Sequence, residues 1–302
     1  MEQYSTSSFS KITEEPFLRG FKREGKVMIM SFLETACKAA KQAGKMILSQ
    51  VSKEMATEKK SSNFDVVTEI DKQSERMIRS CILESYPTHS FLGEEETYVS
   101  TQPIGKTLED ARNIPYLWIV DPIDGTANFI HGIPGFTVSI ALACHGELVL
   151  GVIYDPCRDE LFWAERGKGS YCNGDPISIS TVERAVDCVI ATGFVSTSEF
   201  REINIASMEQ IGKEFRTIRV LGSAALHLAY VACGKLGAFW EYGLSVWDVA
   251  AGVLLVKEAG GMVTSTEGET YQLSNQNIIA SNVKVHPTIL NCLSHYPLSS
   301  IE

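Results

Sequence analysis

The sequence predicts a mixed α/β or α+β domain in which helices pack against β-sheets. Stretches with helical apolar periodicity are interleaved with short apolar runs, and that mixture is typical of layered folds. Three consecutive apolar runs, 137–143, 148–154 and 160–164, are separated by turn residues and predict a meander of strands. The chain has 302 residues, 44% of them hydrophobic, which is enough to bury a large core.

The first part of the chain predicts two amphipathic helices. Residues 31–51 carry an apolar stripe that begins with Phe32 and Leu33, while Lys and Gln fill the other face. Residues 72–86 show a second stripe, and Pro87 marks the end of that helix. The elements that follow are an apolar run ending in acids, a polar loop and a strand, at 91–96, 97–113 and 116–120.

The second part of the chain alternates short strands with helices. A glycine-rich segment at 167–174 predicts a turn after the meander. The helix at 246–259 has a clear stop, because Gly260 and Gly261 follow it. The remaining predicted elements are strands at 186–192, 237–241 and 278–280 and helices at 199–211, 222–233 and 287–293.

Composition narrows the classes of function. The net charge of −10 argues against nucleic acid as the main ligand, because proteins that bind the phosphate backbone carry a basic surface. The eight cysteines form no Cys-x-x-Cys pair, so they predict reduced thiols in a cytoplasmic protein and disfavour a zinc or disulfide framework. No run of eighteen apolar residues occurs, so no membrane span is expected.

The most informative segment is 118–129, WIVDPIDGTANF, in which an apolar run ends in Asp121 and Asp124. Carboxylates at the end of a buried strand are costly unless a positive charge lies beside them. A hard divalent cation prefers such oxygen ligands, and two cations can share one carboxylate. The alternative is a solvated Asp-Pro-x-Asp-Gly turn, which is common, and these two acids alone do not decide between the two readings.

Other acids stand at similar places in the pattern. Glu94 and Glu95 end an apolar run, although a surface acidic loop would look the same. Asp71 and Asp248 stand at helix starts, where an acid also stabilises the helix without any ligand. Each of these acids alone is ambiguous. Together with Glu241 at a strand end, they predict one ligand site, since layered α/β folds bind ligands at strand ends and helix starts.

A hydroxyl and a glycine follow the two aspartates. Thr126 can hydrogen-bond a water molecule and pass its proton to a carboxylate. Gly125 and Thr126 can also present backbone N–H groups to a phosphate if a helix starts there. His131 is a lone histidine and is read as structural, and the chain has no Gly-x-x-x-x-Gly-Lys-Ser/Thr nucleotide loop.

Four segments in the same order resemble the motifs of the inositol monophosphatase family. Residues 121–134, DPIDGTANFIHGIP, are similar to its first signature, and 247–261, WDVAAGVLLVKEAGG, to its second. Residues 65–71, DVVTEID, and 93–95, GEE, are similar to its two upstream motifs. The resemblance covers about residues 31 to 295 and implies a layered α-β-α-β-α sandwich, usually as a homodimer.

The resemblance also implies which residues hold Mg²⁺, with two to three ions in each active site. Glu94, Asp121 and the carbonyl of Ile123 correspond to the ligands of the first ion. Asp121, Asp124 and Asp248 correspond to the ligands of the second. Glu94 would also touch a third ion, mainly through water.

By the same resemblance, Thr126 and Asp71 are the pair that orients and deprotonates the attacking water, and Glu95 supports the metal ligands. The positions that would contact the phosphate or the substrate hydroxyls are Gly125, Thr126, Gly222, Ser223, Ala224, Glu241 and Asp248.

The implied function is Mg²⁺-dependent hydrolysis of a small phosphate monoester, with inositol 1-phosphate as the expected substrate and lithium as an expected inhibitor. Relatives act on histidinol phosphate, fructose 1,6-bisphosphate, NADP or adenosine 3′,5′-bisphosphate, so these substrates remain alternatives. A different alternative is a regulatory binding protein, since some bacterial relatives are partners of the transcription machinery. The expected organisation is a flexible extension at 1–30, a catalytic domain at 31–295 and a tail at 296–302.

Overall fold

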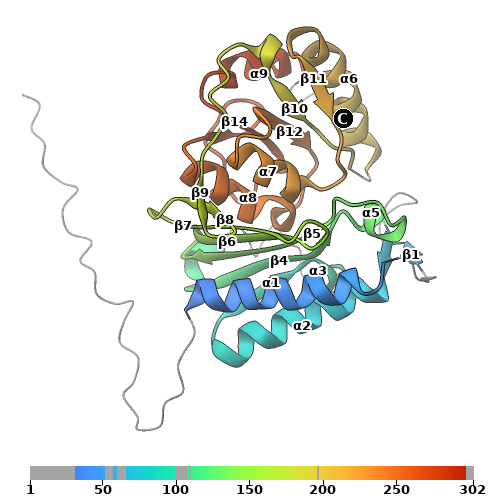
Figure 1. The fold of residues 1–302 in the computed structure, drawn as a ribbon, viewed down its shortest axis with the longest axis vertical. Coiled ribbons are helices and arrows are strands. Elements are labelled where there is room, and N and C mark those ends of the chain that lie inside the picture. The colour runs from blue at the N-terminus through green and yellow to red at the C-terminus, as the bar shows by residue number, and fades with distance from the viewer. Residues whose placement is uncertain are drawn as a thin grey trace, which may run out of the picture.

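The computed structural model describes residues 31–51, 57–59, 66–99, 108, 110–195 and 197–296. Its elements form five layers, helix, sheet, helix, sheet and helix, which Figure 1 shows stacked from bottom to top. The mixed α/β layering predicted from the sequence is therefore confirmed. The predicted extension at 1–30 lies outside the described residues, as does all of the predicted tail except residue 296.

The larger sheet has seven strands and contains the predicted meander. The strands, in order across the sheet, are β3 (Ser90–Gly93), β4 (Leu117–Asp124), β5 (Thr137–Cys144), β6 (Glu147–Asp155), β7 (Glu160–Glu165), β8 (Ser170–Cys172) and β9 (Asp175–Ile177). Strands β3 and β4 are parallel, and every other neighbouring pair is antiparallel. The three predicted meander strands are β5, β6 and β7, so that prediction is confirmed.

The smaller sheet has five strands of mixed direction. Its strands, in spatial order, are β11 (Thr217–Arg219), β10 (Val189–Ala191), β12 (Ala238–Tyr242), β14 (Asn277–Ser281) and β13 (Met262–Thr264). Strand β10 is parallel to both of its neighbours, and β14 is antiparallel to both of its own. A separate antiparallel pair consists of β1 (Thr57–Lys59) and β2 (Val66–Thr68).

Helices cover the outer faces of both sheets and fill the space between them. The outer layers are α1 (Phe32–Leu48) with α2 (Glu69–Ser85) and α6 (Ser198–Glu214) with α9 (His286–Leu293), and the middle layer is α7 (Ala224–Ala232) with α8 (Val246–Glu258). Two short helices, α3 (Glu94–Val99) and α5 (Thr126–Ile130), follow strands of the larger sheet. Two 3₁₀ turns lie at Asp110–Asn113 and Ala185–Asp187.

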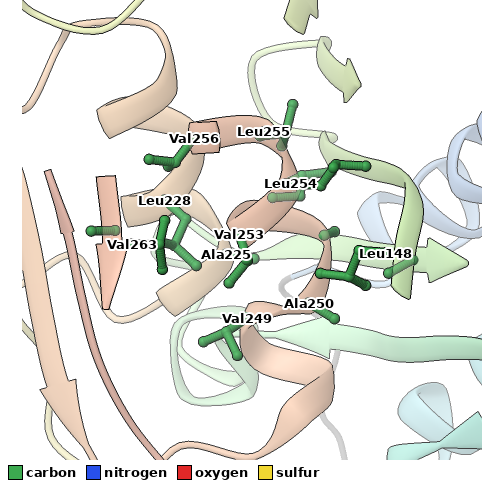
Figure 2. Close-up of a cluster of buried hydrophobic side chains, with 14 of the residues drawn as sticks. Leu148, Ala225, Leu228, Val249, Ala250, Val253, Leu254, Leu255, Val256 and Val263 are labelled. Carbon is green, nitrogen blue, oxygen red and sulfur yellow. The ribbon is translucent and has the colours of Figure 1, made fainter. Parts of the chain in front are cut away.

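Helix α8 is the centre of the largest core. Val249, Val253 and Val256 lie on this helix and are buried, with Leu228 of α7 and Val263 of β13 packed in the same cluster (Figure 2). The same cluster includes side chains from both sheets, so α8 and α7 join the two halves of the molecule. This arrangement holds the N-terminal ends of both helices close to the end of β4.

The structure differs from the sequence predictions at short elements. The predicted turn at 167–174 contains strand β8, which pairs with β9 in a small hairpin, and β11 and β13 were not predicted. Each of these strands has only three residues, too few for an alternating pattern to be visible. Helix α2 starts at Glu69 rather than at 72, because Thr68 caps it through its side chain.

Candidate active site

The candidate site lies where β4 ends. Asp121 pairs with Ser139 of β5 and Asp124 pairs with Thr137, so three steps along β4 match two steps along β5. This irregularity is a bulge, and Pro122 within it has no N–H to donate to a neighbouring strand. Both aspartates lie at the C-terminal end of β4 and are buried, with 2% of Asp121 and 9% of Asp124 exposed.

Asp121 stands among other acids. The parallel register pairs Gly93 with Val120, so Glu94 and Asp121 are the next residues on two neighbouring strands. Burial raises the pKa of Asp121 well above its ordinary value, and the nearby charges of Glu94, Asp124 and Asp248 raise it further. The Ile123 N–H donates to Asp121 Oδ1 at 3.0 Å, which holds the carboxylate within the bulge.

Asp124 connects the larger sheet to helix α7. Its Oδ2 accepts hydrogen bonds from Ser223 Oγ and from the Ala225 N–H, both at 2.6 Å. Burial is the main reason that the pKa of Asp124 rises to about 6, and the bonds from Ser223 and the backbone partly oppose that rise. The predicted substrate-side segment beginning at Gly222 is thus in direct contact with Asp124, one of the predicted metal ligands.

Thr126 and Asp71 are brought together from residues 55 positions apart. Helix α5 begins at Thr126 after Gly125, whose φ of 95° favours glycine. The Thr126 hydroxyl lies 3.1 Å from Asp71 Oδ1 and 3.0 Å from the carbonyl oxygen of Ile123. Asp71 Oδ2 accepts from the Thr68 N–H and hydroxyl, which leaves Oδ1 facing Thr126. Asp71 therefore both caps α2 and contacts the site.

Asp248 caps α8, as Asp71 caps α2, and it also lies at the candidate site. It is the third residue of the helix, and its Oδ2 accepts the Ser245 N–H at 2.7 Å in a capping box. Glu241, at the end of β12, is 4% exposed. Burial raises the pKa of Glu241 well above its ordinary value, and the charges of Asp248 and Asp124 add to the effect. The acids from both sheets therefore share one electrostatic environment.

The acidic pair after β3 is not a surface loop. Glu94 and Glu95 begin helix α3, and Glu95 is only 6% exposed. The carboxylate of Glu75, on α2, accepts the N–H groups of Glu95 at 2.7 Å and Glu96 at 2.9 Å. Glu75 was not predicted as part of the site, although it lies one helical turn after Asp71 on the same face of α2.

A cavity of about 420 Å³ opens beside these acids. The predicted site residues that line it are Glu94, Asp124, Gly222, Ser223, Ala224, Glu241 and Asp248. Its apolar wall includes Phe194, Val195, Phe200, Leu244 and Trp247, none of which was predicted. The other predicted site residues are not among the residues that line this cavity; they are Asp71, Glu95, Asp121, Ile123, Gly125 and Thr126.

Two further residues hold the loop before α7. The side-chain amide of Asn128 donates to the carbonyl oxygens of Leu221 at 2.7 Å and Gly135 at 2.8 Å. Nε2 of His227 accepts the Leu221 N–H at 3.0 Å, and burial lowers the pKa of His227 to about 3. His227 lines the cavity as a neutral imidazole. Sequence reading missed it, because a single His on a helix carries no pattern.

The donor chemistry of the site fits hard divalent cations. Carboxylate oxygens and the Ile123 carbonyl converge on the end of β4, and the described residues that line the cavity include no Lys or Arg. Within the part of the chain that the structure describes, no three His, Cys, Asp or Glu side chains are already arranged as a coordination shell.

Comparison with known proteins identifies the family. A profile described as the inositol monophosphatase family matches residues 29–296. The chain is 38% identical over 276 residues to Nus factor SuhB of Pseudomonas aeruginosa, which covers 88% of this chain and 97% of that protein. It is 40% identical over 237 residues to inositol-1-monophosphatase of Mesorhizobium japonicum, covering 78% of this chain and 85% of that protein.

A solved structure supports the same assignment. The crystal structure of the extragenic suppressor protein suhB from Bartonella henselae superposes with a TM-score of 0.79 at 38% identity. The match covers 88% of this chain and 99% of that one. The layered fold and the four motifs agree with these similarities, and the chain belongs to the inositol monophosphatase family.

Proposed function

We propose that this protein is a Mg²⁺-dependent phosphatase that hydrolyses inositol 1-phosphate. The family is one of phosphatases that generally use Mg²⁺. The observation that carries the proposal is the convergence of Glu94, Asp121, Asp124 and Asp248 on one bulge, beside the contact of Thr126 with Asp71. Acids that raise one another's pKa are stabilised by a divalent cation, and a phosphate ester is attracted by the same cation.

The proposed ligands divide into two sets that share one residue. Glu94, Asp121 and the Ile123 carbonyl would hold the first ion, and Asp121, Asp124 and Asp248 would hold the second. Bound Mg²⁺ would neutralise the phosphate and lower the pKa of a coordinated water. Glu94 would touch a third, weaker ion. The burial of Asp121 supports its central place in both sets, because a buried carboxylate needs a positive partner.

Thr126 and Asp71 are proposed to orient and deprotonate the attacking water. The Thr126 hydroxyl can donate to Asp71 Oδ1 and so turn an oxygen lone pair toward the site. Asp71 Oδ2 is held by Thr68, which fixes the carboxylate for this role. The N–H groups at Gly125 and Thr126 would bind the phosphate, because α5 begins there. Glu95 would support Glu94, the proposed metal ligand that precedes it in the sequence.

The cavity wall favours a leaving group without a second phosphate. No described lining residue is Lys or Arg, whereas the buried Glu241 is part of the wall, as are Ser223 and Ala224. A second phosphate would meet carboxylates without a cationic side chain to neutralise it. A neutral polyol can donate hydroxyl hydrogens to Glu241. This contrast supports inositol 1-phosphate over fructose 1,6-bisphosphate, NADP or adenosine 3′,5′-bisphosphate.

A substrate panel tests this proposal. Phosphate release should be measured with inositol 1-phosphate, with histidinol phosphate and with the three compounds that carry more than one phosphate group, each with Mg²⁺ present. We expect kcat/KM for inositol 1-phosphate to exceed that for each of these three compounds at least about tenfold, because one uncompensated contact between like charges costs more than about 1.4 kcal/mol. Equal or higher values for a bisphosphate would overturn the substrate assignment.

A second candidate function is regulatory binding to the transcription machinery. The similarity to a protein named Nus factor SuhB favours it. The two functions can be separated with Asp121→Asn, which removes a proposed metal ligand from a buried position. Capture of transcription components that persists in this variant would support a binding role, and capture by neither protein would exclude it.

The proposed assembly is a homodimer, as the family resemblance implies. Sedimentation of the purified full chain checks it, and a mass near twice 33.3 kDa is the expected result. In the part of the chain that the structure describes, no helix is long and apolar enough to cross a bilayer. The cytoplasmic location remains a prediction.

A further inference from the structure

We propose that Glu75 and Ser74, on helix α2, are positioning residues that fix Glu94 relative to Asp121. The inference rests on the proposed metal-dependent function, in which these two acids share an ion. Neither Glu75 nor Ser74 contacts the cavity. Their effect would reach the site through the backbone of the two segments that carry the metal ligands.

Glu75 uses both of its carboxylate oxygens to hold the start of α3. Oε2 accepts the Glu95 N–H at 2.7 Å, and Oε1 accepts the Glu96 N–H at 2.9 Å. The side chain is 6% exposed, so these bonds replace water that the carboxylate has lost. Arg79 of α2 also contacts Glu96, which is a second tie between the two helices. The turn that begins with Glu94 is thereby docked onto α2.

Gly93 shows how close this docking is. A methyl group at Gly93 would overlap the carboxylate of Glu75, so a side chain at this position would displace it. Gly93 also ends β3 in register with Val120 of β4. The residue before the first proposed ligand is therefore fixed from two sides, by the neighbouring strand and by Glu75.

The adjacent residue of α2 holds the other ligand segment. The Ser74 hydroxyl donates to the Pro122 carbonyl oxygen at 3.1 Å, inside the bulge that separates Asp121 from Asp124. Ser74 is fully buried, so this bond is shielded from water. Ser74 and Glu75, successive residues of α2, therefore hydrogen-bond to the backbone after Asp121 and to the backbone after Glu94. Helix α2 thereby fixes the separation between Glu94 and Asp121.

The chemistry of Glu75 indicates an acceptor rather than a charge partner. Its neighbours Glu94 and Glu96 are acidic, so its negative charge does not balance theirs. Burial raises the pKa of Glu75, whereas the two N–H groups lower it. The favourable interaction is the pair of hydrogen bonds, and these depend on the length and geometry of the side chain.

The experiment measures binding of Mn²⁺, as a paramagnetic probe of the Mg²⁺ sites, to the metal-free full chain. The variants are Glu75→Gln, which leaves one acceptor oxygen, and Glu75→Asp, which keeps the charge but shortens the reach. Both should weaken binding about tenfold or more, the range seen when partners of metal ligands are removed. Glu69→Gln is the matched control, because Glu69 lies exposed on the same helix and pairs with Arg76.

Activity at increasing Mg²⁺ separates positioning from a general loss of folded protein. A positioning role predicts that the Mg²⁺ concentration for half-maximal activity rises about tenfold, while kcat at saturating Mg²⁺ recovers to within about threefold of wild type. Binding constants within twofold of wild type in both Glu75 variants would overturn the inference. The inference would also be overturned if Glu75→Gln bound Mn²⁺ weakly while Glu75→Asp bound it as wild type does. The negative charge at position 75 would then be enough for Mn²⁺ binding, without the reach of the glutamate side chain.

Gly93→Ala gives an independent variant if the Glu75 variants fail to fold. It leaves Glu75 in the chain but pushes its carboxylate away, so the same weakening of about tenfold is expected. Gly212→Ala is its control, because its nearest neighbouring atom would be 3.8 Å away. Unchanged Mn²⁺ binding in Gly93→Ala would contradict the inference. Failure of the wild-type chain to bind Mn²⁺ would instead contradict the proposed function.

Discussion

At the scale of single residues, two acids of the candidate site also cap helices. Asp71 Oδ2 caps α2 while Oδ1 faces Thr126, and Asp248 Oδ2 caps α8 from the third position of the helix. The sequence alone leaves two readings for each acid, helix stabilisation or ligand. The structure shows that helix capping is present at both positions, and that Asp71 also contacts Thr126 through its other oxygen.

The burial of Asp121 predicts an unusual effect of removing its charge. Its raised pKa means that the metal-free native state holds a proton that the unfolded chain releases, so stability falls as pH rises above the ordinary range of Asp. Asp121→Asn keeps an oxygen for the Ile123 N–H and removes the charge. At pH 8 with a chelator, we expect its free energy of unfolding to exceed that of wild type.

Asp187→Asn provides the opposite case in the same denaturation experiment. Hydrogen bonding to Arg184 is the main reason that the pKa of Asp187 is lowered, and Arg216 contributes as well. Removing this charge should lower stability at pH 8. If Asp121→Asn is less stable than wild type in the presence of chelator, the prediction is wrong. The charge of the Asp121 carboxylate would then be compensated by other groups of the chain.

His227 predicts a measurable pH dependence of stability. Burial lowers its pKa to about 3 from an unfolded value of about 6.5, so the unfolded chain binds a proton first as the pH falls. The stability that neutral His227 provides is therefore present above pH 6.5 and is lost toward pH 3, at about 1.4 kcal/mol per pH unit.

The comparison for His227 is His227→Gln in chelator between pH 6 and pH 4. The glutamine oxygen can accept the Leu221 N–H in place of Nε2 and does not titrate. We expect the free energy of unfolding of the variant to fall less steeply, by about 1.4 kcal/mol per pH unit. Parallel slopes in urea denaturation of the two proteins would refute this account of His227.

At the scale of elements, long periodic segments were predicted well and short ones were not. The helix beginning at Val246 and the strands β5, β6 and β7 have enough residues to show their period. Strands β11 and β13 have three residues each and are strands only because β10 and β14 lie beside them. These two segments become strands by pairing with strands that are distant in the sequence, and a single sequence does not show such pairing.

The packing of α8 against the larger sheet predicts the cost of a small change in β6. A methyl group at Gly151 would lie 2.6 Å from the carbonyl oxygen of Ala251 and 3.0 Å from its Cα, so sheet and helix would have to separate. Gly151→Ala should lower the free energy of unfolding by about 1–3 kcal/mol. Urea denaturation measures this loss.

Gly212→Ala is the matched control for this prediction, because Gly212 lies in α6 and a methyl group there would be 3.8 Å from its nearest neighbouring atom, an ordinary contact distance. A helical Gly→Ala change without a clash should be neutral or stabilising by up to about 1 kcal/mol. Equal stability of Gly151→Ala and wild type would show that the contact between β6 and α8 yields easily.

At the scale of the whole molecule, the fold and the acids were more predictable than the groups that hold them. The segment 118–129 showed Asp121 and Asp124 next to a strand, because strand and acids are contiguous in sequence. Glu75 and His227 act on backbone groups that are brought close only by the fold, and they have no motif of their own. Asn128 lies within the segment 118–129, but its hydrogen bond to the Leu221 carbonyl also depends on the fold. The wall of the cavity, formed partly by Phe194 and Phe200, escaped prediction for the same reason.

The layered architecture explains why the site needs the complete domain. Ligand candidates come from α3, from β4 and from α8, and Asp124 is bonded to the start of α7. Helices α7 and α8 join the two sheets through the central core. A separation of these layers would divide the acids between two bodies, so activity should be lost together with the cooperative unfolding of the domain.

The most direct test of the central claim is phosphate release from inositol 1-phosphate by wild type and Asp121→Asn, each with Mg²⁺ and with chelator. We predict turnover by wild type only when Mg²⁺ is present, and a loss of at least about 100-fold in Asp121→Asn, because it removes the ligand that we propose two ions share. Circular dichroism should show the variant folded. Turnover by wild type in chelator, or near-wild-type turnover by folded Asp121→Asn, would contradict the account.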